Sequence, residues 1–277
     1  MDHTPATAKK LTTSRRWIGV AVLVVLLAAT AFAMNKPAPI SITSLRVGLD
    51  VSAMPLSNGT RNYTDEDFEA RFADELARHL GAEVTLVPLS RTEQTSALWQ
   101  GDVDVVLTRS ANDATTADKV LALPTGFQSG LSVAMRSDTR VRQWRDLTGQ
   151  VVCASASNAR AQALASALDS HLKVFPAPAQ VLAQVRTGEC TAAILDRAQL
   201  DPLFQRKEWL KFSATLPPTE PSRLVAEVSA DRTDLAAMVR AALAQIGTTA
   251  RWTERREKWA ANVAFEVYFD QIGPDCH

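Results

Sequence analysis

The first half of the chain, from residue 44, alternates between short apolar runs and longer amphipathic segments. Three runs predict buried strands, at 45–50, 84–87 and 103–107. Between the first two, apolar side chains recur at every fourth position, which predicts a helix through Phe68, Phe72, Leu76 and Leu80. We expect Thr64 to cap this helix, with acidic residues in its first turn, and Gly81 to end it. A second short helix is expected at 92–100, so the order predicts a parallel α/β sheet.

The same rhythm returns in the second half. Further strands are expected at 131–135, 150–154, around Val174, at 192–195 and at 224–228, and helices at 157–168, 179–186 and 235–246. A charged helix carrying Trp252 and Trp259 follows, with its apolar stripe expected to pack on the first lobe. Two α/β units joined through the strands near 133 and 225 predict two lobes with a ligand cleft between them. We assign residues 44–134 with 224–265 to the first lobe, 135–223 to the second, and 266–277 to a C-terminal tail.

The first 39 residues have the pattern of an export signal. Basic residues between positions 9 and 16 precede an uninterrupted apolar run, Ile18–Met34, which contains Ala31-Phe32-Ala33 as a small-residue cleavage site. The run is longer than a usual signal core and slightly short of a membrane span of about 20 residues. Residues 1–39 are therefore either a cleaved signal peptide or a membrane anchor formed by 18–34. Both alternatives place the rest of the chain outside the cytoplasm.

Charge and cysteine content narrow the function classes. Lys plus Arg and Asp plus Glu balance at 30 each, so no net field favours nucleic acid as a partner. The four histidines are scattered without metal-ligand spacing, and we expect neither a metal nor another cofactor. The three cysteines are Cys153, Cys190 and Cys276. An oxidising compartment allows one disulfide among them and leaves one thiol over, and composition alone leaves the pair open.

Several short motifs, in order and at matching spacing, resemble the family 3 periplasmic solute-binding proteins, the amino-acid-binding components of ABC importers. The motifs are the helix Phe68-x-x-x-Phe72-Ala73-x-x-Leu76, the segment Leu98-x-x-Gly101-x-Val103-Asp104, the step Asp146-Leu147-x-Gly149, and the segment from Thr187-Gly188 to Leu195-Asp196. The resemblance implies a type II periplasmic-binding-protein fold, in which two α/β lobes are joined by two crossovers. It also implies a small-molecule ligand and an ABC permease as partners.

The resemblance further implies where a ligand would bind. Asp196 matches the residue that holds the ligand ammonium in the family, although a solvated loop position is the alternative. Thr108 and Ser110 follow the strand that leads into the pocket. Ser157 and Asn158 begin a helix, where free N–H groups favour a carboxylate. A plain N-cap role is the alternative for Ser157.

The sequence departs from the family pattern at two features of the site. The turn at 115–119 lacks the arginine that usually binds the ligand carboxylate, so we expect Arg109 to replace it, with a surface ion pair as the alternative. Positions 53–54 and 90–91 lack the usual aromatic residues, and Arg91 adds positive charge that suits an acidic ligand. The predicted ligand-binding set is Asp50, Arg91, Thr108, Arg109, Ser110, Ser157, Asn158 and Asp196.

The predicted function is capture of an amino acid or related organic acid outside the cytoplasm for an ABC importer. One alternative is a sensor or accessory domain of the same fold held at the membrane. A second is a dehydratase-like enzyme, but the cleft segments contain no histidine and no nucleophile–base pair, so we do not expect an enzyme. Some relatives carry cysteines at the places of Cys153 and Cys190, which implies a disulfide there. Two reduced, buried thiols are the alternative.

Overall fold

The computed structural model describes residues 42–55, 63–66, 68–111 and 119–269. The predicted export segment, including 18–34, and Cys276 lie outside these residues. Among the described helices, none is long and apolar enough to cross a membrane. Contacts within the described chain gather residues from Ile42 onward into one compact unit.

The first part of this unit is a parallel three-stranded sheet with two helices, which we call the first lobe. Its elements are β1 (Ser44–Asp50), the 3-10 helix η1 (Val51–Ala53), α2 (Glu69–Leu80), β2 (Glu83–Leu89), α3 (Gln94–Gln100) and β3 (Val105–Ser110). The central strand β1 pairs in parallel with both β2 and β3, as predicted. Phe72 and Leu76 of α2 are fully buried against the strands, so the predicted apolar stripe is confirmed.

A second parallel unit, which we call the second lobe, has the same construction. Its elements are η2 (Trp144–Leu147), β5 (Val151–Ser155), α4 (Ala159–Ala167), β6 (His171–Phe175), α5 (Pro178–Thr187), β7 (Ala192–Asp196), α6 (Arg197–Phe204) and η3 (Lys207–Phe212). Here β5 is central and pairs in parallel with β6 and β7. The apolar runs predicted these three strands, whereas α6 and η3 were not predicted.

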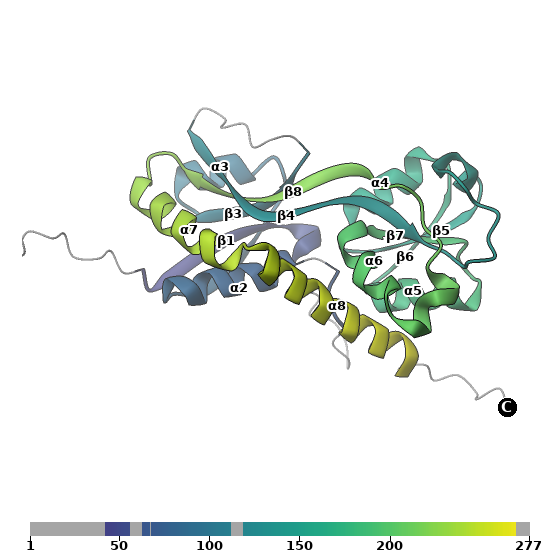
Figure 1. Ribbon diagram of the computed structural model, residues 1–277. Helices are drawn as coiled ribbons and strands as arrows, with labels where there is room; N and C mark the ends of the chain where they lie inside the picture. The colour runs from purple at the N-terminus through teal and green to yellow at the C-terminus, as the bar shows by residue number, and fades with distance from the viewer. Residues whose placement is uncertain (1–41, 56–62, 67, 112–118, 270–277) are drawn as a thin grey trace, which may run out of the picture. The chain divides into compact units, whose positions relative to one another are not determined.

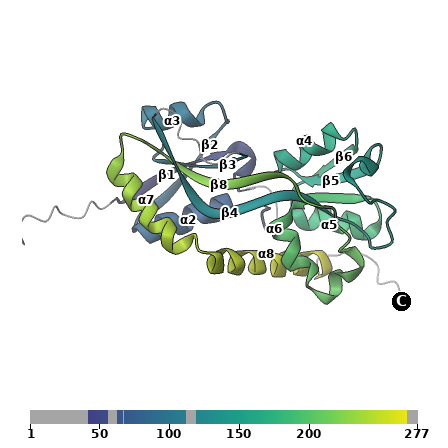
Figure 2. The same ribbon diagram turned by 45° about the horizontal axis from the view of Figure 1, so that its top comes forward.

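Two long antiparallel strands join the lobes, as the two predicted crossovers require. They are β4 (Val120–Ala134) and β8 (Thr219–Ser229), and they complete one sheet of order β2-β1-β3-β8-β4-β7-β5-β6. Figures 1 and 2 show them running side by side from one lobe to the other. Their register shifts between Pro124 and Gln128. Within this irregularity Gly126 has a φ of +85°, and a Cβ there would lie 2.1 Å from the carbonyl oxygen of Gly247.

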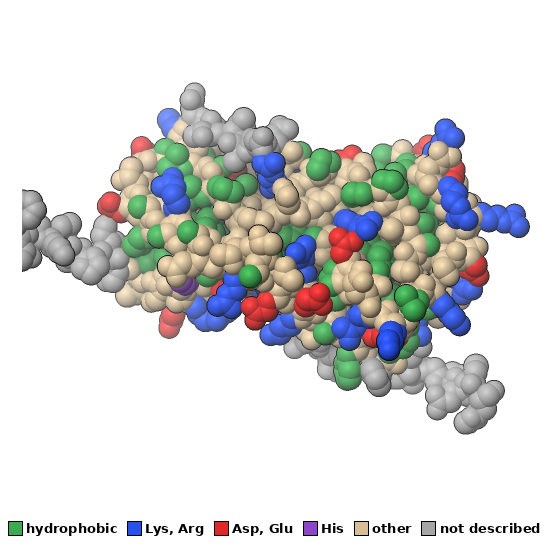
Figure 3. All heavy atoms as spheres, viewed as in Figure 1, with side chains coloured by type: hydrophobic (Ala, Val, Ile, Leu, Met, Phe, Trp, Pro, Cys, Tyr) green, Lys and Arg blue, Asp and Glu red, His purple; other side chains and the backbone are tan. Residues whose placement is uncertain are grey.

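The last two helices cover one side of this arrangement (Figure 1). They are α7 (Thr233–Ile246) and α8 (Thr249–Phe269). At the start of α8, the Trp252 ring packs against Phe68, Phe72 and Phe127. Farther along, α8 contacts α5 and α6 of the second lobe. On this side of the molecule acidic and basic side chains lie close together (Figure 3), and the pair Arg255–Glu75, at 2.6 Å, links α8 to α2.

The predicted start of α2 was wrong, and the strand predicted at 131–135 was too short. Thr64 does not cap α2, which begins at Glu69; its N–H and hydroxyl bind Glu266 Oε1 of α8 instead. Asp65 and Glu66, expected as acidic residues of the first helical turn, come before α2, and Glu66 is buried. The strand predicted at 131–135 is the end of the 15-residue β4. Its apolar pattern is interrupted by Pro124, Gly126 and Gly130, which are residue types that weaken or break strands.

Cys153 and Cys190 form the disulfide that the resemblance implies, with their Cα atoms 6.0 Å apart. Cys153 lies on β5, and Cys190 lies just before β7. The bond therefore joins two neighbouring strands of the second lobe.

We predict that breaking this bond destabilises the protein. The cysteines are 37 residues apart in the chain, and closing a loop of that size contributes about 3–4 kcal/mol in the chain-entropy model. Urea unfolding of Cys153→Ser/Cys190→Ser should show this loss, and Cys276→Ser should behave as wild type. An equal loss in the Cys276→Ser control would contradict the assignment.

Candidate functional site

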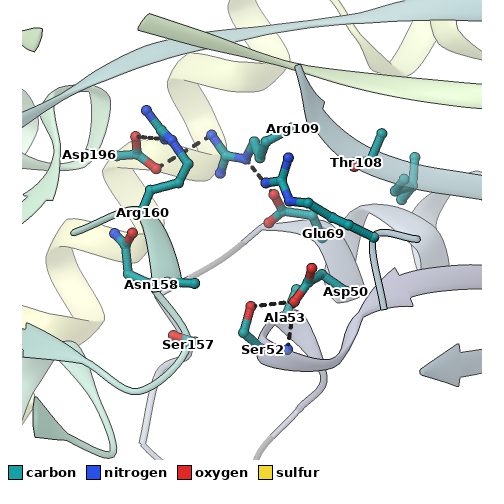
Figure 4. Close-up of a pocket in the computed structure, with 13 residues that line it drawn as sticks. Asp50, Ser52, Ala53, Glu69, Thr108, Arg109, Ser157, Asn158, Arg160 and Asp196 are labelled. Atoms are coloured by element: carbon teal, nitrogen blue, oxygen red, sulfur yellow. Dashed lines mark hydrogen bonds and ion pairs between the residues drawn. The ribbon is translucent and has the colours of Figure 1, made fainter. Parts of the chain in front are cut away.

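A small cavity lies where the carboxyl ends of parallel strands from both lobes meet, as expected for an open α/β fold. Its volume is about 70 Å³. Figure 4 shows side chains from β1, β3, α2, β7 and the start of α4 converging on it. Its lining comprises Asp50, Ser52, Ala53, Glu69, Arg91, Leu107, Thr108, Arg109, Ser157, Asn158, Ala159, Arg160 and Asp196.

The structure brings together every residue of the predicted ligand-binding set except Ser110. Ser110 ends β3 beside Arg223 of β8 and does not line the cavity. None of the described lining residues is aromatic, in keeping with the sequence at 53–54 and 90–91. The charged lining residues that sequence reasoning missed are Glu69 and Arg160. Neither was assigned a role from the sequence, because their partners Arg109 and Asp196 lie far away in the chain.

Arg109 is the charged centre of the site. Its side chain is 9% exposed, so it is not the surface ion pair considered as the alternative. The guanidinium Nε lies 2.5 Å from Glu69 Oε1, and Nη1 lies 3.4 Å from Asp196 Oδ2. The guanidinium carbon also stands 4.6 Å from the centre of the Phe127 ring. Arg109 therefore links a carboxylate of the first lobe to one of the second (Figure 4).

Asp196 is buried at the end of β7 and is not a solvated loop residue. Its second oxygen, Oδ1, lies 3.3 Å from Nη1 of Arg160. The other terminal nitrogen of Arg160, Nη2, donates a hydrogen bond to the carbonyl oxygen of Glu220. Each carboxylate oxygen of Asp196 therefore meets a different guanidinium. A buried carboxylate needs such compensation, and the two arginines supply it to Asp196.

The start of α4 presents polar groups to the cavity. Asn158, not Ser157, caps this helix, because its side-chain oxygen accepts a hydrogen bond from the N–H of Ala161. The N-cap role considered for Ser157 is therefore wrong. Ser157 lines the cavity, and its hydroxyl lies 3.0 Å from that of Ser155.

On the first-lobe side, Asp50 ends β1 and accepts hydrogen bonds from the N–H and hydroxyl of Ser52. Arg91 is exposed and forms no ion pair with a described residue. Glu69 Oε2 is buried and has no hydrogen-bond partner among the described residues. In the described part of the chain the site thus has three arginines and three carboxylates, and it offers a buried acceptor and an exposed cation to a ligand.

Comparison with known proteins agrees with this architecture. The family model for bacterial extracellular solute-binding proteins, family 3, matches residues 45–262. The chain therefore belongs to this family of extracytoplasmic binding proteins, and its fold is the two-lobed α/β fold of periplasmic binding proteins. No curated protein matches the chain.

Solved structures share the fold at low sequence identity. An ancestral cationic amino acid solute-binding protein is 22% identical and has a TM-score of 0.54, with 78% of this chain and 95% of that chain covered. The amino acid ABC transporter substrate-binding protein AbpA from Streptococcus pneumoniae, bound to L-arginine, is 15% identical and has a TM-score of 0.51, with the same coverage. At these identities the likeness extends to the fold alone.

We predict that Arg109→Gln lowers the free energy of unfolding by about 3–5 kcal/mol, because it leaves two buried carboxylates without their shared cation. Urea unfolding measures the change. The matched control is Arg136→Gln, which removes the exposed ion pair with Asp138 and should cost at most about 1 kcal/mol. Equal losses in the two variants would contradict the burial argument.

Proposed function

We propose that this protein binds an amino acid or a related organic acid in the cavity between its lobes and delivers it to the permease of an ABC importer. The observation that carries the proposal is the convergence of Arg109 of the first lobe and Asp196 of the second on one buried site. A ligand with charges of both signs suits such a site, because its own charges, once buried, must be met by groups of opposite sign.

The two ends of an amino acid have partners of suitable chemistry. A carboxylate suits the guanidiniums and the N–H groups at the start of α4, where the helix dipole is positive. An ammonium suits Asp196 and Glu69 Oε2, the buried oxygen described above. To reach Asp196, the ammonium shares it with Arg109 and Arg160 or displaces one of them. Arg91 suits a second carboxylate, which favours an acidic ligand.

Binding at this place acts on both lobes together. The crossovers β4 and β8 connect the lobes, and their pairing is irregular near Gly126. Domain closure around a ligand uses a few residues of this kind as a hinge. A closed clamp outside the cytoplasm then presents a defined surface to the permease.

Binding without catalysis fits the lining residues better than an enzyme does. Among the described residues that line the cavity there is no histidine, cysteine or lysine, the side chains that most often transfer protons or attack substrates near neutral pH. The carboxylates of Glu69 and Asp196 are engaged by arginines, which suits electrostatic recognition.

The experiment is thermal denaturation of the purified protein with a panel of amino acids, dicarboxylates and small organic acids. A true ligand at a hundred times its dissociation constant should add roughly 2.7 kcal/mol of stability. We expect Asp196→Asn to abolish that gain. Asp201→Asn, an exposed control position in α6, should retain it. A gain that survives in Asp196→Asn would place the ligand elsewhere, and no gain with any compound would count against the transport role.

A further inference from the structure

Glu66, just ahead of α2, makes a buried contact between the lobes that the cavity does not include. Its side chain has no exposed surface. One carboxyl oxygen accepts a hydrogen bond from the hydroxyl of Ser155, and the other accepts one from the amide of Asn158. Its backbone carbonyl accepts a further hydrogen bond from the side chain of Gln199. All three partners belong to the second lobe.

The segment that carries Glu66 is itself fixed in place. The side chain of Glu266 in α8 binds the N–H and hydroxyl of Thr64 at 2.8 Å, and the Trp259 indole donates to the Asp65 carbonyl at 2.9 Å. Three residues beyond Glu66, Glu69 holds Arg109 in the cavity. Glu66 therefore lies between the start of α4 on one side and the charged centre of the site on the other.

Asn158 connects this contact to ligand binding. Its amide nitrogen donates to Glu66, while its amide oxygen caps α4 through the N–H of Ala161. Asn158 also lines the cavity. With both ends of its amide engaged, Asn158 has one orientation as long as Glu66 stays in place.

The surroundings of Glu66 make this contact sensitive to protons. Burial raises the pKa of the Glu66 carboxyl from 4.5 to about 7; the hydrogen bonds from Ser155 and Asn158 oppose the rise, Asp196 adds to it and Arg109 opposes it. The charged residues that act on its carboxyl are Asp196 at the end of β7 and Arg109 on β3. These two contact Arg160 of α4 and Glu69 of α2 in turn, and Glu266 of α8 binds Thr64, two residues before Glu66. From α6 the neutral Gln199 faces it.

We propose that Glu66 is a positioning residue that latches the lobes together and holds Asn158 at the cavity, and that proton uptake by Glu66 favours the closed clamp. The inference rests on the proposed function in one respect, the opening and closing of the lobes. Opening separates Glu66 from Ser155 and Asn158 and returns its carboxyl to water.

The direction of the pH effect follows from the two states. In the open state the pKa of Glu66 has its ordinary value near 4.5, and in the closed state it is about 7. Closing therefore takes up a proton between these values, and the closing equilibrium weakens as pH rises from about 4.5 to 7. One proton gives at most a tenfold change for each pH unit. Above about 7 the equilibrium levels off.

The test measures the distance between the lobes without any ligand, so it does not depend on the ligand's identity. Fluorophores are attached at Gln100→Cys on α3 and Ala167→Cys on α4, both exposed, in a Cys276→Ser background. Single-molecule energy transfer then gives the closed-to-open ratio from pH 5 to 8.5. We expect this ratio to fall severalfold or more between pH 5 and 7 and to level off above about 7.

Glu66→Gln keeps the shape of the side chain and removes its titration. We expect it to abolish the pH dependence and to stay more closed than wild type at pH 8, while Glu66→Asp restores part of the dependence. The control Glu93→Gln, at an exposed position in the first lobe, should follow the wild-type profile. A flat wild-type profile, or a dependence that persists in Glu66→Gln, would overturn the proposal. The measurement needs no ligand, so its result tests this proposal even if the protein binds none of the compounds in the panel.

Discussion

The ion pairs of Arg109 are the interaction on which the site depends. Its guanidinium lies against Glu69 in one lobe and Asp196 in the other, and all three side chains are nearly excluded from water. Buried charges of this kind contribute little net stability when complete, but removing one partner is costly. They therefore act mainly on geometry, because the lobes can close without penalty only where the guanidinium meets both carboxylates.

In the second lobe, a disulfide fixes the two strands that make these contacts. The disulfide joins Cys153 on β5 to Cys190 just before β7. Two residues beyond Cys153, Ser155 meets Glu66, and at the far end of β7, Asp196 meets Arg109. The covalent link thus holds together the two strands whose ends make the contacts to the first lobe. A ligand in the cavity would add its own charges to an arrangement already aligned by protein groups.

Much of the fold could be predicted from the sequence because its signals are local. Phe68, Phe72 and Leu76 recur at every fourth position, which indicates a helix with one buried face. The short apolar runs indicate strands buried on both faces. The position of Asp196 after a buried strand was also visible. Local signals failed where a residue's partner lies far away in the chain. Thr64 looks like a helix cap but binds Glu266, and Glu66 looks like an acidic residue of a first helical turn but meets Ser155. Glu69 drew no prediction, because its partner Arg109 lies 40 residues away. Arg160 gave no signal, because its role depends on Asp196, 36 residues away.

The most direct test of the central claim, that Arg109 and Asp196 couple the lobes through a buried charge pair, is a double-mutant cycle. It compares the free energies of unfolding of wild type, Arg109→Gln, Asp196→Asn and the double variant. Residues in direct contact within one buried network typically couple by about 0.5–3 kcal/mol. We predict a favourable coupling of at least about 1 kcal/mol, within that range. Additive losses, with a coupling near zero, would contradict the claim that this pair joins the lobes.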